Sequence, residues 1–288
     1  MLLRRSAPFL GAAALVLSSA TAVAQEEPPA EEPTAAEEAP AEEPAAKEEP
    51  ATKDAETAEA VAEAEAGSSP VEEPGKTYRF VGLRYRGIIV PKFMMNLFGD
   101  GGRTVYVHGF GPEFTIRKDA FEYVFSLWYA AYSMKDTPFK ASSDGEDAWE
   151  IVRSEIKVLY LTSDFLWSHE FSPEFSLNYG MGAGFGFVFG NLYRNQAYPP
   201  NNTTDPYQYV KCPGPTQGNQ SYCGTDNDHY GNYTEDSWAG GGSKPIIFPW
   251  LALQTGLRYK PHKNFTARLD AGFGLSGFFF GLAGNYGL

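Results

Sequence analysis

The stretch 175–190, FSLNYGMGAGFGFVFG, alternates with a period of two. Large apolar side chains such as Phe175, Met181 and Phe187 occupy one parity, while serine, asparagine and mostly glycine occupy the other. In an extended strand this pattern sends the bulky groups to one face and leaves the other face almost bare backbone. A soluble sandwich strand usually shows charged residues or threonine on its second face. The pattern therefore predicts a membrane-spanning strand with lipid outside and a crowded lumen inside.

Residues 77–288 contain further segments that alternate in the same way. The eight predicted strands are 78–90, 104–117, 121–134, 150–162, 175–190, 248–259, 265–275 and 278–288. The connections at 118–120 and 260–264 are short and the one at 163–174 is longer, whereas those at 91–103, 135–149 and 191–247 are generally long. The turn at 276–277 is the exception, because it is minimal where a long loop was possible. Short turns on one rim and long loops on the other are typical of outer-membrane barrels. We expect an all-β, eight-stranded, antiparallel up-and-down transmembrane barrel. Ten strands, or a soluble barrel or sandwich, are the alternatives.

The chain before residue 77 has a different composition. Residues 1–24 combine a short basic region, an apolar run and a small-residue cleavage site, which predicts a secretory signal peptide. Residues 25–76 are rich in alanine, glutamate and proline and have no aromatic residue, which predicts a disordered periplasmic linker. This linker carries a net charge of −14, against −13 for the whole chain, so the acidity belongs to the linker. The predicted barrel has no basic patch that would favour nucleic acid.

These features together resemble the small outer-membrane β-barrels of Gram-negative bacteria, the outer-membrane protein A and X type. The resemblance covers about residues 77–288 and includes a last strand that ends in Tyr286 and Leu288, where the family commonly has a terminal phenylalanine. It implies insertion into outer-membrane lipid by the outer-membrane assembly machinery. The family spans anchors, adhesins, small pores and lipid-modifying enzymes, so the fold alone does not decide the function.

The parity opposite the predicted lipid face carries many charged side chains. They are Arg84, Arg86, Glu113, Arg117, Glu122, Arg153, Glu155, Lys157, Arg258, Arg268 and Asp270. An eight-stranded lumen is just wide enough to be filled by side chains, so these charges must pair or face water. The first interpretation is a plug of salt bridges. The alternative is a narrow path that prefers anions, because seven of these residues are basic and four are acidic.

The long loop 191–247 contains the only two cysteines of the chain, Cys212 and Cys223. In an exported protein we expect them to form a disulfide. The loop is dense in tyrosine, asparagine, glycine and aspartate, a composition that suits recognition of a surface ligand but is equally that of an undirected loop. Calcium binding by Asp226, Asp228, Glu235 and Asp236 is a weaker alternative, because the bidentate glutamate of a calcium loop is missing.

No serine, histidine and acid fall on one face near the long-loop rim, so we do not expect an enzyme. We expect no cofactor and no resident metal. The predicted function is a structural, anchoring or surface-recognition role in the outer membrane. The linker could reach the cell wall or another envelope protein. A small passive channel for ions or small solutes is the second hypothesis, and a lipid-modifying enzyme is the third.

Overall fold

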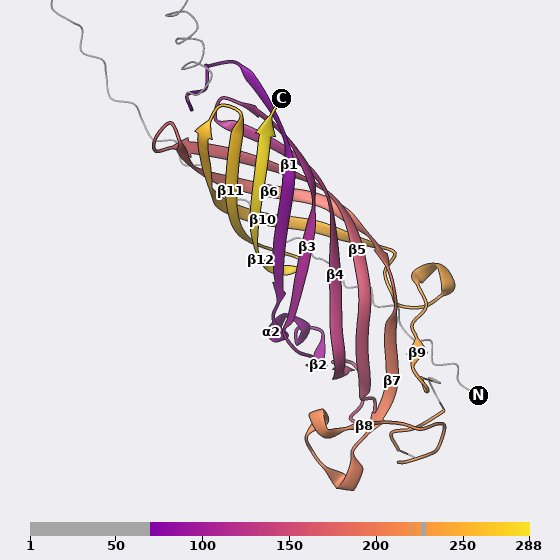
Figure 1. The fold of residues 1–288 in the computed structure, drawn as a ribbon. Coiled ribbons are helices and arrows are strands. Elements are labelled where there is room, and N and C mark those ends of the chain that lie inside the picture. The colour runs from indigo at the N-terminus through magenta and orange to yellow at the C-terminus, as the bar shows by residue number, and fades with distance from the viewer. Residues whose placement is uncertain (1–69, 220, 226–228) are drawn as a thin grey trace, which may run out of the picture. The chain divides into compact units, whose positions relative to one another are not determined.

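The computed structural model describes residues 70–219, 221–225 and 229–288. The predicted signal peptide and most of the predicted linker lie outside these residues. Eight long strands dominate the described part (Figure 1). They are β1 (Thr77–Val90), β3 (Val105–Lys118), β4 (Phe121–Ala141), β5 (Glu150–Glu170), β6 (Phe175–Phe189), β10 (Ile247–His262), β11 (Phe265–Gly274) and β12 (Gly277–Gly287).

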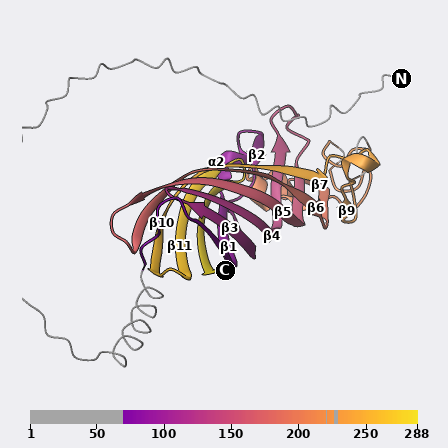
Figure 2. The same ribbon diagram turned by 90° about the horizontal axis from the view of Figure 1, so that it is seen from above.

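The strands pair antiparallel in the order β1, β3, β4, β5, β6, β10, β11 and β12, and β12 pairs back onto β1. This last pairing runs from Ile89 opposite Phe278 to Phe80 opposite Gly287, and it closes the sheet. Figure 2 shows the strands curving around from another side. Closure leaves no unpaired strand edge in the barrel. The predicted all-β, eight-stranded transmembrane barrel is therefore confirmed.

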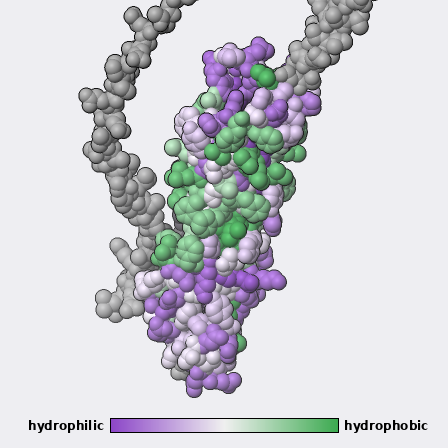
Figure 3. Space-filling view, turned by 90° about the vertical axis from the view of Figure 1, so that its left-hand side faces the viewer, coloured by the Kyte–Doolittle hydropathy of each residue, from purple (hydrophilic) through white to green (hydrophobic). Residues whose placement is uncertain are grey.

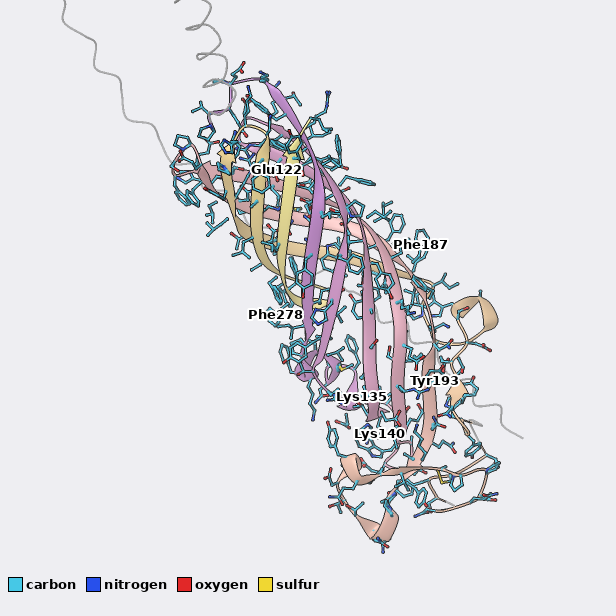
Figure 4. The ribbon with its side chains drawn as sticks, viewed as in Figure 1. Glu122, Lys135, Lys140, Phe187, Tyr193 and Phe278 are labelled. Atoms are coloured by element: carbon cyan, nitrogen blue, oxygen red, sulfur yellow. A yellow bond between two sulfur atoms is a disulfide. The ribbon has the colours of Figure 1, made fainter. Side chains whose placement is uncertain are left out.

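The outer face of the barrel is apolar. Leu83 is 70% exposed, Phe110 64% and Leu253 66%, and the phenylalanines of β6 alternate outward as the sequence predicts. Figure 3 shows a hydrophobic band between two more hydrophilic ends. Phe187 and Phe278, on opposite sides of the view in Figure 4, both belong to this band. Among the described residues, no helix has the length and hydrophobicity to cross a membrane.

One rim of the barrel, which we call the short-turn rim, consists of tight connections and both ends of the barrel sequence. β3 and β4 are joined by Asp119 and Ala120, with Asp119 in the left-handed region (φ 51°). β5 continues to Glu170, so the predicted 12-residue connection at 163–174 was wrong and only residues 171–174 form the turn. The alternation simply continues, because Asp164 and Leu166 are buried while Phe165 and Trp167 face outward.

At the opposite rim, which we call the long-loop rim, β4 and β5 extend well beyond their neighbours (Figure 1). This extension pairs with β2 (Gly99–Gly101) on one side and β7 (Leu192–Tyr198) on the other, and β7 pairs with β8 (Val210–Lys211) and β9 (Tyr233–Thr234). The segment 91–104 carries the short helix α2 (Lys92–Met95), and three 3₁₀ turns are Pro200–Asn202, Pro206–Gln208 and Trp238–Gly240. None of these strands enters the barrel, so there are eight barrel strands and not ten. We call β7, β8, β9 and the other described residues between 191 and 246 the surface subdomain.

The glycine face of β6 makes room inside the barrel. A Cβ at Gly186 would come within 2.8 Å of the Tyr160 ring, and one at Gly182 would collide with the Asp164 carboxylate. Both of these partners come from β5, which pairs with β6. The bare backbone of β6 therefore does not widen the lumen but accommodates large side chains of its neighbour.

Candidate functional site

The candidate site is the barrel lumen, which is filled by two stacked layers of side chains. The layer nearer the short-turn rim is charged. Arg84 lies 2.7 Å from both Glu113 and Asp164, and Arg268 lies 3.0 Å from Glu113. Arg268 also contacts Glu122 at 2.8 Å, and it contacts Asp270 at 3.0 Å. The side chains in these pairs are at most 4% exposed.

The register of the strands explains why these groups meet. Arg84 on β1 pairs with Gly111 on β3, two residues before Glu113, and with Ala283 on β12, which in turn lies opposite Arg268. Small residues opposite each arginine leave space for its guanidinium to cross the lumen. Buried charges are tolerated only when they are paired and hydrogen-bonded, and this layer provides carboxylates from β3, β4, β5 and β11.

Glu122 connects the charged layer to the short-turn rim. It lies 3.8 Å from Arg117 and 3.4 Å from Arg258, in addition to its contact with Arg268 (Figure 4). Both arginines also bind Glu72, at 2.6 Å for Arg117 and 3.0 Å for Arg258.

Glu72 belongs to the stretch that the sequence assigns to the linker. It also contacts the ammonium of Lys260 at 2.7 Å, and Lys260 is 1% exposed. Burial raises the pKa of the Glu72 carboxyl. The charges of Arg258 and Arg117 and the hydrogen bonds from Arg117 and Lys260 outweigh this effect and lower the pKa to about 2. The end of the acidic tract therefore places an ionised carboxylate among basic side chains at the short-turn rim.

The second layer is aromatic and lies beyond the charged layer. Trp128 stacks on Tyr160 with ring centroids 4.3 Å apart, and Trp250 meets both rings edge-on at 5.1 Å and 5.5 Å. Arg86 joins the two layers, because its guanidinium lies 4.5 Å from the Phe279 ring centroid and 5.0 Å from that of Trp250. The same arginine reaches Asp164 at 3.5 Å. Cations lie favourably over aromatic faces, particularly when desolvated.

Three of the charged residues assigned to the lumen are outside it. Arg153 and Glu155 form an exposed pair at 3.7 Å, with side chains 37% and 52% exposed, and Lys157 is exposed as well. Their inward neighbours on β5 are Ser154 and Val158. The prediction inverted the parity of this strand because it assumed that charges always face the lumen. β5 continues beyond the apolar band, where its outward face meets water and can carry charge.

The sequence interpretation also missed three members of the site, Glu72, Asp164 and Lys260. Continuing the alternation of β5 past residue 162 would have placed Asp164 inside. Among the described residues, the lumen then holds six basic side chains and five acidic ones. The basic ones are Arg84, Arg86, Arg117, Arg258, Lys260 and Arg268, and the acidic ones are Glu72, Glu113, Glu122, Asp164 and Asp270. The large basic excess that motivated an anion path is absent.

The surface subdomain is held to the β4–β5 extension by polar contacts. Arg194 on β7 lies 2.6 Å from Glu150 on β5 and 3.0 Å from Glu235. Burial raises the pKa of Glu235, but hydrogen bonds from Ser243 and the charge of Arg194 lower it below its ordinary value. The Glu235 carboxylate is therefore engaged by the Arg194 guanidinium and by the backbone amide of Ser243.

Cys212 and Cys223 form the predicted disulfide, with a Cα–Cα distance of 5.7 Å, and both cysteines are buried. Asp226 and Asp228, the first two residues of the weak calcium motif, lie outside the described residues. Among the residues that are described, no group of three His, Cys, Asp or Glu side chains could hold a metal ion.

No protein-family model matches the chain, and no curated protein matches it. Solved structures do match it. The attachment invasion locus protein Ail of Yersinia pestis, solved with the heparin analogue sucrose octasulfate, is 12% identical, covers 75% of this chain and 100% of its own, and has a TM-score of 0.35. Neisserial surface protein A is 6% identical over 74% of this chain and 98% of its own, with a TM-score of 0.33.

The N-terminal β-barrel domain of Pseudomonas aeruginosa OprF is 12% identical over 75% of this chain and 100% of its own, with a TM-score of 0.30. These similarities are low. The strand pairing of the chain itself establishes the barrel.

Proposed function

We propose that this chain is an integral protein of the bacterial outer membrane whose barrel is a sealed anchor. The observation that carries the proposal is the combination of an apolar outer band with a lumen filled by paired charges and stacked aromatic rings. The short turns and both barrel ends share one rim, which in outer-membrane barrels faces the periplasm. The acidic tract then lies in the periplasm and the surface subdomain lies outside the cell.

Two features favour an anchor over a passive channel. The nearly balanced charges of the lumen are paired across several strands, so they have little excess charge with which to select an ion. The aromatic layer then blocks the same path with Trp128, Tyr160 and Trp250, each at most 1% exposed. An eight-stranded barrel has space for such a filling and little more.

Planar bilayer recordings test the sealed lumen. The purified full chain, reconstituted after its heat-modifiable gel migration confirms folding, should give no discrete openings. Regular single-channel steps from folded protein would contradict the anchor role and support the passive channel.

Cysteine labelling tests the orientation. Lys135 is exposed near the long-loop rim (Figure 4). Lys118, the last residue of β3, is exposed at the short-turn rim. A membrane-impermeant maleimide should label Lys135→Cys on intact cells and Lys118→Cys only after the outer membrane is opened. The reverse pattern would overturn the assignment.

The surface subdomain is the candidate for recognition of an external ligand. It presents Tyr207 and Trp238, which are 52% and 55% exposed, on a scaffold fixed by the disulfide and by Arg194. Exposed aromatic groups on a rigid platform offer large contact area at low entropic cost. The acidic tract, which we place in the periplasm, is proposed to reach the cell wall or another envelope protein. The last strand is proposed to be recognised by the outer-membrane assembly machinery.

A further inference from the structure

An apolar cavity of about 280 Å³ lies at the long-loop rim, on the inner side of the β4–β5 extension. Residues from α2, five strands and the loop at Gly102 converge on it, among them Val90, Met95, Val105, Tyr132, Phe139 and Leu192. Tyr132 connects the cavity to the aromatic layer, because its hydroxyl lies 2.8 Å from that of Tyr160. The cavity therefore sits over the sealed lumen and is separate from the charged layer.

The polar groups in the cavity wall already have partners. The Ser154 hydroxyl donates to the carbonyl oxygen of Tyr132 at 2.7 Å, and the Tyr132 hydroxyl is bonded to Tyr160. The remaining wall is largely hydrocarbon with the thioethers of Met95 and Met134. An apolar cavity of about 150 Å³ already admits benzene. This chemistry selects an apolar guest.

The lip of the cavity adds two further features. The segment 91–104 exposes Phe93, Leu97 and Phe98, which are 60%, 70% and 56% exposed, beside the inward-facing Met95. The same segment carries Lys92 and Arg103 at its neck, where the Lys92 amide donates to the Thr104 hydroxyl at 3.2 Å.

Neither cation of the neck has a carboxylate partner among the residues that the structure describes. The Lys92 ammonium lies 5.0 Å from the Tyr207 ring centroid, and Tyr207 in turn donates to the carbonyl oxygen of Gly102. The nearby Asp100 is instead directed to Lys140, at 3.5 Å. Apolar side chains and uncompensated positive charge are thus found together at the lip.

We propose that this cavity binds the hydrocarbon chain of a single-chain anionic amphiphile, of the fatty-acid type, with its head group beside Lys92 and Arg103. Filling an apolar cavity provides van der Waals contacts that its wall atoms otherwise lack. The methyl end of the hydrocarbon chain is therefore favoured inside the cavity. The exposed side chains of the lip continue the apolar path to the outside. The volume admits one chain and not the two chains of a phospholipid.

The test uses the full chain in phospholipid nanodiscs and the fluorescent fatty acid cis-parinaric acid as the probe. Wild-type protein should show saturable binding of one probe per chain above the signal of empty nanodiscs. Met95→Trp places a larger ring in the cavity from the end of α2. It should lower the affinity for the probe about ten-fold or more, because the ring occupies the space of the hydrocarbon chain. Leu97→Trp adds the same ring to the exposed side of the same loop and should change the affinity little.

The head-group site is tested separately. The double variant Lys92→Glu/Arg103→Glu should weaken binding of the acid but not of its neutral methyl ester. Absence of saturable binding, or equal affinities for Met95→Trp and Leu97→Trp in protein with normal heat-modifiable migration, would overturn the cavity assignment. Equal losses for the acid and the ester would overturn the head-group site. None of these outcomes depends on whether the surface subdomain recognises a partner.

Discussion

Arg268 binds the carboxylates of Glu113, Glu122 and Asp270 in the middle of the barrel. Such a residue is costly to remove, since its partners stay buried without a counter-charge. Arg153 provides a comparison within the same protein, because its one carboxylate partner among the described residues is Glu155 and both side chains are exposed by more than a third.

We expect Arg268→Met to destabilise the barrel by about 3–5 kcal/mol, the usual cost of breaking a buried ion pair. The matched variant Arg153→Met should cost about 0–1 kcal/mol, as for other surface pairs. Urea unfolding in lipid or detergent, followed by tryptophan fluorescence, measures the difference. Equal effects of the two variants would mean that the lumen network does not stabilise the fold.

Glu72 provides a second prediction at the residue scale, because its pKa is lowered from 4.5 to about 2. A carboxyl with a lowered pKa stabilises its contact fully above the unfolded value and loses this contribution as the pH falls through the folded value. The Glu72 contact should therefore persist from neutral pH to about 4.5 and weaken as the pH approaches 2.

A spin label at Val71→Cys reports this contact, and the native cysteines do not interfere because they are paired with each other. Its mobility should be low at neutral pH and rise at the acid end. Glu72→Gln should make the label mobile at every pH. Glu73→Gln is the control, since Glu73 is exposed and pairs only with Lys76 among the described residues, and a mobile label in this variant would contradict the specific role of Glu72.

At the scale of elements, the two faces of β6 have different roles. Its outward residues form part of the apolar band, while its inward glycines receive Tyr160 and Asp164 from β5. Larger side chains at Gly182 and Gly186 would have no space, because the neighbouring side chains of β5 already occupy it.

We expect Gly186→Val to impair folding, since its side chain would overlap the Tyr160 ring and overpacking costs about 1–3 kcal/mol or more. Ala183→Val makes a change of similar size on the exposed face of the same strand and should be tolerated. Heat-modifiable migration after refolding into detergent distinguishes the two. Normal folding of Gly186→Val would show that the aromatic layer is loosely packed.

At the scale of the whole molecule, the barrel and the surface subdomain are stabilised by different means. The barrel depends on a closed sheet and a filled lumen, whereas the subdomain depends on short strands, the ion pairs of Arg194 and one disulfide. The two should respond separately to reduction.

Reduction of the Cys212–Cys223 bond should leave the heat-modifiable migration of the barrel unchanged. It should destabilise the subdomain by about 3 kcal/mol, the effect expected for closing a short loop. Limited proteolysis of intact cells should then cut within residues 199–225 faster in reduced protein than in oxidised protein. Loss of the barrel on reduction would show that the two parts are coupled.

The alternation of side chains was sufficient to predict the number of barrel strands and the outer apolar band, but not the full length of β4 and β5 or the face of the β5 charges. A period of two needs only local chemistry, because each side chain is assigned to a face by its parity. The disulfide followed from the presence of two cysteines in an exported chain.

The partners inside the lumen were decided only by the tertiary structure. Whether Arg84 meets Asp164, and whether Glu72 reaches Arg117 and Lys260, depends on the register between distant strands and on where each strand leaves the apolar band. The inverted parity of β5 has the same origin. Local pattern assigns a face, but the boundary between lipid, lumen and water is a property of the closed barrel, which no single strand contains.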